Sequence, residues 1–402
     1  MYRPGQSGGI LAGVRRPTVL LLFATIFVGE LGWSGIAPLL PNYQERFGLS
    51  DLATGLVLSV AAVGILLVSL PAGALSRRFA IRTLTLWGVA ALVFGNLLTG
   101  FARTYPMLLG GRFLLGIGLG TMWVTATAWL HDAAGASAAR ALALTTAVVG
   151  AGSLVGPVIA GYLGQQFSPG VPFVVLGVLC AITGVALSFA PGDEARAAEP
   201  SPPLAEMLRA ARADDLMVTS ILLTLVVAMM WMTVELLVPL RLNDLGFDAA
   251  RIGLAFSAAS IMFVAASAMT ARGAERYATL RVAAMWCTAF AACILIAAVG
   301  SSGAATVAFL AAMGLTTGVL IALTYPLGAV GAAEGGFSVA VVGALLNMVW
   351  AGAGIVGPTL GGSLSQRLGD RVVFWILAIV GFAAAGWMWS RRAASARAQE
   401  PR

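Results

Sequence analysis

Twelve runs of mostly apolar residues, each about 20 residues long, follow one another along the 402-residue chain. Short breaks rich in charge, Pro or Gly separate them. A helix needs about 20 residues to cross the hydrocarbon of a bilayer, whereas barrel strands are shorter and alternate in polarity. The sequence therefore predicts an all-α polytopic membrane protein with twelve transmembrane helices. We place them at 18–40, 52–75, 83–102, 106–130, 141–163, 171–190, 216–240, 252–271, 281–300, 304–328, 338–364 and 372–390.

The chain carries too little charge for a water-soluble surface. Hydrophobic residues make up 59% and charged residues 10%, against about 25% charged residues in soluble domains. The net charge of +7 does not indicate nucleic acid, because all basic residues are Arg and, apart from Arg112, lie in the breaks. We expect the lipid bilayer and a small-molecule substrate as partners, no nucleic acid, and a monomer.

The Arg residues also predict an orientation. With the N-terminus in the cytoplasm, 17 Arg fall in cytoplasmic segments and 6 in segments on the other side. Cytoplasmic loops of membrane proteins carry the excess of positive charge. Both termini are therefore expected in the cytoplasm. The Arg-only, Ala- and Gly-rich composition is typical of a GC-rich bacterial genome, so we expect a multi-pass protein of the bacterial cytoplasmic (inner) membrane.

The longest polar segment, 191–215, separates six runs from the other six. It is Pro-rich at first and then has a short amphipathic stretch from Leu204 to Arg212. We interpret it as a cytoplasmic linker between an N-terminal six-helix half, 1–190, and a C-terminal six-helix half, 216–402.

Four pairs of segments recur in chain order at an offset of 198 or 201 residues. The pairs are Gly156–Gly161 with Gly357–Gly362, Pro38 and Asn42 with Pro239 and Asn243, Arg77–Ala80 with Glu275–Ala278, and Gly116 and Gly120 with Gly314 and Gly318. Six helices separate the copies, so the halves are expected to be parallel, pseudo-symmetric repeats about an axis normal to the membrane.

The break after the second run, from Pro71 to Arg82, resembles the cytoplasmic-loop motif Gly-x-Leu-Ala-Asp-Arg-x-Gly-Arg-Arg of the major facilitator superfamily. Gly73 and Arg78 fit that motif, whereas Arg77 stands in place of its Asp and Ala80 in place of its second Gly. In the family, the Asp of this motif helps to hold helix two against helix eleven, so the resemblance implies that this contact is altered here. It is therefore open whether the altered loop still gates, and its Arg residues can equally be cytoplasmic loop charges alone.

Two further segments extend the resemblance over the chain. Arg112–Gly120 resembles the helix-four motif Arg-x-x-x-Gly-x-Gly. Gly152–Gly161 resembles the helix-five motif Gly-x-x-x-Gly-Pro-x-x-Gly-Gly of the drug/proton antiporter branch, with Ala160 replacing one Gly. Small residues four apart let helices approach closely, so packing alone is the simpler interpretation. The residues concerned are Gly116, Gly120, Gly152, Gly156, Pro157, Gly161 and, in the second copy, Gly357 and Pro358.

Three charged residues fall well inside the apolar runs: Glu30, Arg112 and Glu235. A charge near the bilayer centre costs roughly 2.5–3.5 kcal/mol, so it implies a partner, a water-filled cavity or a neutral form. The resemblance implies that helices one, four, seven and ten, which carry all three, line a central cavity. Glu30 and Arg112 lie about 15 and about 9 Å from the outer end, within reach of each other. Arg112 can also extend to the interface, and Glu235 is shallow enough to do likewise.

Aromatic, polar and polarizable residues of the cavity helices and of helix eleven are candidates for the substrate cavity, although in membrane helices aromatic residues more often pack or face lipid. They are Trp33, Trp231, Met230, Tyr325 and Asn347. His131 and Asp132 end the fourth run, where Asp132 is expected as a cap and gate contact. One His excludes a His-based metal centre, and the three Cys form no metal-binding pair, so we expect no metal.

These features favour a proton-coupled exporter of small lipophilic or cationic compounds that works by alternating access. Glu30, Arg112 and Glu235 are the expected proton-coupling residues, with Glu30 paired to Arg112. The proton gradient is the expected energy source, without a cofactor. A uniporter or symporter of a polar metabolite is the alternative, although the cavity helices hold few polar groups. No catalytic constellation is visible, so we expect no enzyme.

Overall fold

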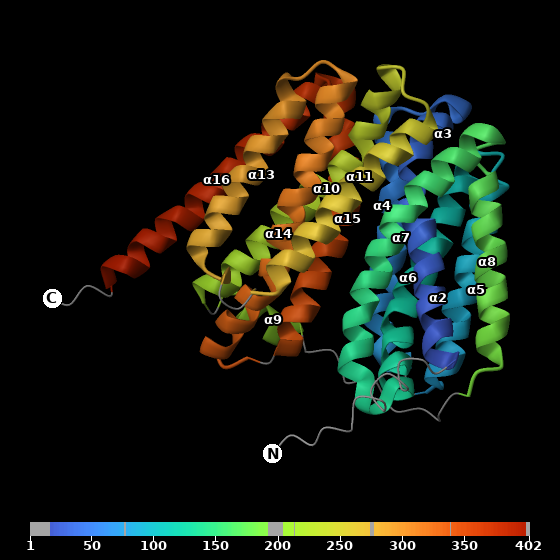
Figure 1. The fold of residues 1–402 in the computed structure, drawn as a ribbon, viewed down its shortest axis with the longest axis horizontal. Coiled ribbons are helices and arrows are strands. Elements are labelled where there is room, and N and C mark those ends of the chain that lie inside the picture. The colour runs from blue at the N-terminus through green and yellow to red at the C-terminus, as the bar shows by residue number, and fades with distance from the viewer. Residues whose placement is uncertain are drawn as a thin grey trace. The chain divides into compact units, whose positions relative to one another are not determined.

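The computed structural model of the protein describes residues 17–75, 78–191, 204–212, 214–273, 277–337 and 339–398. Within these ranges the regular elements are helices (Figure 1). In chain order they are α2 (Pro17–Ser34), α3 (Leu40–Phe47), α4 (Asp51–Leu75), α5 (Ile81–Gly100), α6 (Tyr105–Ala134), α7 (Ala138–Gln166), α8 (Val171–Ser188), α9 (Leu204–Ala210), α10 (Asp215–Asp244), α11 (Ala249–Ala271), α13 (Leu280–Val299), α14 (Gly303–Glu334), α15 (Val339–Leu368) and α16 (Asp370–Ala398).

Twelve segments in the described ranges are long and apolar enough to cross a membrane, which confirms the predicted all-α, twelve-span fold. Several helices run past the apolar runs from which they were predicted. The run at 304–328, for example, lies in α14, a helix of 32 residues. Such a helix is about 48 Å long, so it projects beyond a hydrocarbon core of about 30 Å.

The first run, predicted as one helix over 18–40, is interrupted. Helix α2 ends at Ser34, a 3₁₀ turn covers Ala37–Leu39, and α3 follows. Pro38 in that turn has no backbone N–H, and its ring would collide with the carbonyl of Ser34 in a continuous helix. The proline is compatible with a break here, but it does not require one, because the equivalent Pro239 lies inside the continuous helix α10.

The amphipathic stretch of the predicted linker forms the short helix α9. Its residues Met207 and Ala210 are buried in an apolar cluster with residues from three other helices. The other buried members are Met217, Ala332, Val341, Val342, Leu345 and Leu346. The first part of the linker, 192–203, lies outside the described residues.

The chain divides into two compact units. Unit 1 comprises Met1–Asn42 and Val60–Pro200, and unit 2 comprises Tyr43–Ser59 and Ser201–Arg402. The units follow the predicted halves except that most of α3 and the first turns of α4 group with unit 2. Helix α4 therefore contributes residues to both units.

The internal repeat is visible in the contacts that glycines make inside each unit. A methyl group added at Gly116 of α6 would overlap the backbone oxygen of Ala61 of α4. In unit 2, a methyl group at Gly314 of α14 would overlap the backbone oxygen of Ala259 of α11. Both members of the second pair lie 198 residues after those of the first. Glycine at these positions lets the backbones touch, and this packing is repeated in the two units.

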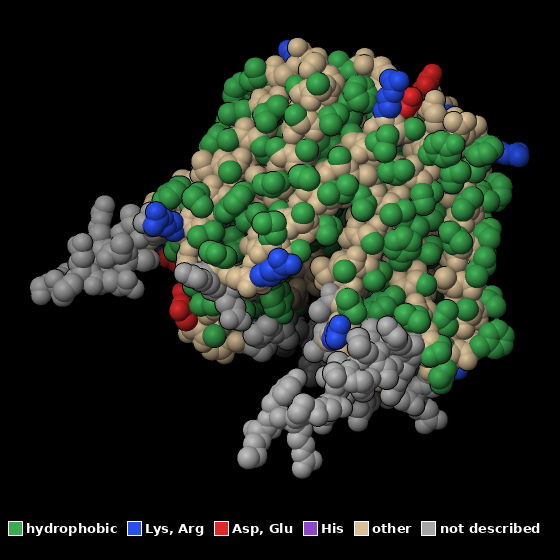
Figure 2. Space-filling view, viewed as in Figure 1, with side chains coloured by type: hydrophobic (Ala, Val, Ile, Leu, Met, Phe, Trp, Pro, Cys, Tyr) green, Lys and Arg blue, Asp and Glu red, His purple; other side chains and the backbone are tan. Residues whose placement is uncertain are grey.

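The outer surface is largely apolar. Figure 2 shows hydrophobic side chains over most of the described part of the visible face, with only a few charged side chains among them. Large apolar residues such as Phe94, Ile182 and Val299 are more than half exposed. In a membrane protein such side chains contact lipid, so the surface agrees with the low charge content of the sequence.

Candidate functional site

Glu30 lies on α2, half-buried, with its side chain against α7 in unit 1. The hydroxyl of Ser153 on α7 donates a hydrogen bond of 2.6 Å to Oε1 of Glu30. A methyl group added at Gly152 would lie 2.7 Å from Cβ and 2.8 Å from Cγ of Glu30. The bare glycine therefore makes room for the stem of Glu30, and the next residue binds its carboxylate.

The contact between α2 and α7 continues one turn further along both helices. Ser34 Oγ lies 2.9 Å from the backbone oxygen of Glu30 and 3.4 Å from that of Gly152, and donates to both. A methyl group at Gly156 would overlap Ser34 Oγ. The antiporter-like segment of α7 thus packs along the face of α2 that carries Glu30.

Arg112 of α6 is fully buried in unit 1. Its Nη1 donates a hydrogen bond of 3.1 Å to the backbone oxygen of Gly32 on α2, and its guanidinium carbon lies 5.9 Å from the centre of the Trp33 ring. Arg112 therefore binds α2 close to Glu30, but the hydrogen bond to Glu30 comes from Ser153. The electrostatic pairing of Glu30 with Arg112 stays a prediction.

Asn96 of α5 is a polar residue that the sequence analysis missed. It is fully buried, and its amide nitrogen donates to the backbone oxygen of Leu92 at 2.9 Å. Its Oδ1, which has no hydrogen-bond partner among the described residues, would lie 3.1 Å from a methyl group at Gly32. Asn96 and Arg112 thus meet α2 at the same glycine. Asn96 could have been found as a side-chain amide within an apolar run. Ser153 could have been found in the same way, as a hydroxyl beside the motif residue Gly152.

The candidate residues of unit 2 occupy different environments. Glu235 of α10 is 5% exposed, and the ring of Trp231 lies 6.3 Å from the ring of Phe263. Met230 is buried, and its methyl group would lie 3.2 Å from a methyl group at Gly381 of α16. Met230 therefore packs between helices.

Two further cavity candidates of unit 2 are exposed. Tyr325 of α14 is 46% exposed, and Asn347 of α15 is also exposed. Both side chains are therefore available to a solute or to lipid. Whether they contact a substrate stays a prediction.

The motif glycines on α15 repeat the arrangement seen on α7. A methyl group at Gly357 would lie 3.0 Å from Cβ of Met232 and 3.1 Å from the backbone oxygen of Met229, both on α10. Thr233 Oγ1 donates to the backbone oxygen of Gly357 at 3.1 Å. Gly357, Gly156 and their following prolines, Pro358 and Pro157, therefore lie on helices that pack closely against α10 and α2, respectively.

The altered cytoplasmic-loop motif is only partly described. Arg77 lies outside the described residues, and Gly73 falls within α4. Arg78 is exposed in the turn that follows. Asp132 of α6 lies 3.2 Å from His131 Nδ1, and His131 is exposed. The gating roles of these residues stay predictions.

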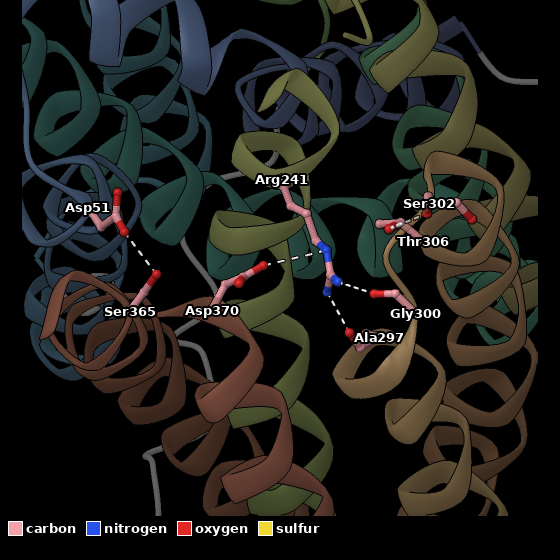
Figure 3. Close-up of polar contacts among 8 residues, drawn as sticks. All are labelled: Asp51, Arg241, Ala297, Gly300, Ser302, Thr306, Ser365 and Asp370. Carbon is pink, nitrogen blue, oxygen red and sulfur yellow. Dashed lines mark hydrogen bonds and ion pairs between the residues drawn. The ribbon is translucent and has the colours of Figure 1, made fainter. Parts of the chain in front are cut away.

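Unit 2 holds a buried cation that the sequence analysis counted as a loop charge. Arg241 of α10 is 7% exposed. Figure 3 shows its guanidinium group directed at the backbone oxygens of Ala297 and Gly300, to which it donates, and at Asp370, whose Oδ2 lies 3.5 Å from Nε. Its guanidinium carbon also lies 5.5 Å from the centre of the Phe374 ring. One side chain therefore ties α10 to α13 and α16.

Figure 3 also shows Asp51, the first residue of α4, beside Ser365 of α15 in unit 2. Ser365 Oγ donates to Asp51 Oδ2 at 2.8 Å, and Gln44 Nε2 donates to Oδ1 at 2.9 Å. Further along α4, Ser59 Oγ donates to the backbone oxygen of Ile355 at 2.8 Å. The first turns of α4 are therefore hydrogen-bonded to α15.

Comparisons with known proteins give the relatives of this chain. Two come from Bacillus subtilis. The uncharacterized MFS-type transporter YceJ is 29% identical over 167 residues, which are 41% of this chain and 42% of that protein. Multidrug resistance protein 1 is 28% identical over 152 residues, which are 38% of this chain and 39% of that protein. The chain thus matches about two fifths of the length of each relative.

The fold is similar to that of the nucleoside transporter NupG, with a TM-score of 0.76 and 13% identity over 93% of this chain and 99% of that one. At that identity the likeness concerns the fold alone. A sequence profile described as Major Facilitator Superfamily matches residues 22–351, which is most of the chain. The protein therefore belongs to the Major Facilitator Superfamily, a family of membrane transporters rather than of enzymes.

Proposed function

We propose that this transporter exports small lipophilic or cationic compounds in exchange for protons, by alternating access. The observation that carries the proposal is the carboxylate of Glu30, held within the membrane-spanning helix α2 by Ser153. Ionisable residues inside membrane helices are costly and mark ion or proton pathways. A cation and a proton compete for one negative site, so the arrival of one displaces the other.

The matched relatives support export. One of them is named as a multidrug resistance protein, and its match covers 38% of this chain. The antiporter-like segment of α7 lies against Glu30, which is where an exchange site would require it. In this proposal the proton gradient supplies the energy without a cofactor, the protein resides in the bacterial inner membrane, and both termini are cytoplasmic.

The test uses the full chain in proteoliposomes with an imposed pH gradient and tetraphenylphosphonium as the lipophilic cation. We expect the wild-type protein to move the cation against its concentration gradient while protons flow in the opposite direction. Glu30→Gln keeps the shape of the side chain but removes its charge, so it should abolish this coupled movement. Glu45→Gln, at an exposed position of α3, is the matched control and should transport normally.

Two results would contradict the proposal. Coupled export at the normal rate by Glu30→Gln would remove Glu30 from the mechanism, and Glu235 would become the next candidate. Transport of a sugar, nucleoside or amino acid, with no movement of lipophilic cations, would establish the uniporter or symporter alternative instead.

A further inference from the structure

One face of α2 is fitted to α7 over two turns. Phe27, Glu30 and Ser34 succeed one another along this face, and each meets the same short stretch of α7. A methyl group at Gly152 would lie 3.2 Å from the backbone oxygen of Phe27 as well as on the stem of Glu30. A helix places residues three and four apart on the same side, so Phe27, Glu30 and Ser34 share one face. The contact of this face with α7 restricts the direction of the Glu30 side chain. Cβ and Cγ of Glu30 have no room to move toward α7 without displacing the backbone of α7 at Gly152.

The carboxylate of Glu30 then meets a hydroxyl. The 2.6 Å distance from Ser153 Oγ to Oε1 falls in the range of O–H···O⁻ bonds, which are short and stronger than bonds between neutral groups. A hydroxyl both donates and accepts, so Ser153 can donate to the ionised carboxylate and accept from the protonated acid. Ser153 can therefore remain hydrogen-bonded to Glu30 in both the ionised and the protonated state of a proton-exchange cycle.

Other polar groups near this part of α2 come from different helices. Arg112 of α6 donates to the backbone oxygen of Gly32, and Asn96 of α5 meets the same glycine. Cys180 of α8 lies 4.0 Å from the Asn96 amide nitrogen. These groups contact α2 near Gly32, two residues after Glu30, whereas the hydrogen bond from Ser153 to the carboxylate comes from α7.

We infer that Ser153 is a positioning residue for Glu30, and that the Gly152–Ser153 step of the antiporter-like segment forms one wall of the proton-exchange site. This inference rests on the proposed function, in which Glu30 couples proton and substrate movement. It gives the segment a chemical role in addition to close helix packing. The hydroxyl fixes where the carboxylate lies and stabilises its ionised form, while the glycine makes room for its stem.

The test compares Ser153→Ala with Ser34→Ala in the same proteoliposomes. Both variants lose one hydroxyl from the same helix contact, but only Ser153 binds the carboxylate. Hydrogen bonds to charged groups contribute enough energy to move a titration by about one pH unit. We expect the pH of half-maximal transport to rise by about one unit in Ser153→Ala and to stay unchanged in Ser34→Ala. Ser153→Thr keeps the hydroxyl and should restore the wild-type profile.

A second readout is independent of transport. Infrared difference spectra recorded on acidification contain a carboxyl C=O band for each acid that protonates, and the band missing from Glu30→Gln belongs to Glu30. We expect Ser153→Ala to shift the frequency of that band and Ser34→Ala to leave it in place. This shift would be seen even if Glu30 did not couple transport, so failure of the proposed function and failure of this inference are distinguishable. An unshifted band would overturn the inference. A shifted band with an unchanged pH profile would instead contradict the proposed function, in which Glu30 sets that profile.

Discussion

Ser365 at the end of α15 donates a 2.8 Å hydrogen bond to the carboxylate of Asp51, the first residue of α4. The two residues are separated by 314 positions in the sequence, yet both belong to unit 2. Nearby, a methyl group added at Gly55 would overlap the backbone oxygen of Pro358. The first turns of α4 are thus attached to α15 by side-chain bonds and by direct backbone contact.

The Asp51–Ser365 bond should contribute measurably to stability. A hydrogen bond to a charged group contributes about 1.5–3 kcal/mol, and partial exposure of Asp51 reduces this. We expect a coupling energy of about 1 kcal/mol between Asp51→Ala and Ser365→Ala in a double-mutant cycle, measured by chemical unfolding in mixed micelles. Ser390→Ala, whose hydroxyl bonds only within its own exposed helix end, should show no coupling to Asp51→Ala.

Arg241 should be far more sensitive to substitution than an exposed Arg of the same kind. Breaking a fully buried ion pair costs about 3–5 kcal/mol, and the 33% exposure of Asp370 lowers this. We expect Arg241→Met to reduce the free energy of unfolding by about 2–3 kcal/mol. Arg251 also pairs with an aspartate, Asp248, but is 67% exposed, so Arg251→Met should cost less than about 1 kcal/mol. Equal losses in the two variants would contradict this account of the Arg241 network.

The glycines before the two helix prolines should not tolerate large side chains. Gly156 and Gly357 lie at the contacts of α7 with α2 and of α15 with α10, where even a methyl group meets atoms of the other helix. We expect Gly156→Leu and Gly357→Leu to lose transport of the lipophilic cation. Gly386 of α16 has no atom within 4 Å of an added methyl group, and Gly386→Leu should transport normally. Full activity of the first two variants would show that these contacts are dispensable.

The predicted orientation can be tested with single cysteines. The three native cysteines are buried, so an added exposed cysteine should dominate labelling. With both termini in the cytoplasm, Ser301→Cys in the turn before α14 should react with an impermeant maleimide added outside the cells. A cysteine appended after Arg402 should react only after the membrane is opened. The reverse pattern would invert the topology.

The sequence was sufficient for the architecture because the bilayer restricts it so strongly. Runs of about 20 apolar residues have one practical structure in lipid, so the twelve helices could be predicted. The repeat was also visible, since Gly116 and Gly314 mark equivalent contacts. Helix ends were less predictable, because α14 remains helical beyond the apolar run. The break after Ser34 is not visible in hydropathy, and Pro38 alone does not predict it, because the equivalent Pro239 lies inside a continuous helix.

The partners of the charged residues could not be predicted in the same way. Sequence position gives the depth of Glu30 but not its direction around the helix axis, which depends on how α2 and α7 pack. Depth made Arg112 the expected partner, which stays a prediction, and it could not identify Ser153, which donates the observed hydrogen bond. Arg241 was counted as a loop charge, because its burial depends on α10 extending past the apolar run.

The matched glycine contacts show that the two units repeat the same close helix packing, but the repeat does not extend to Glu30 and Ser153. The position 201 residues after Glu30 is Trp231, and the position 201 residues after Ser153 is Gly354. The second unit therefore repeats the helix crossings without repeating the acid and its hydroxyl. In the proposed function, the acid that is held by a hydroxyl therefore belongs to the first unit, while the buried Glu235 of the second unit lies at a different place in the repeat.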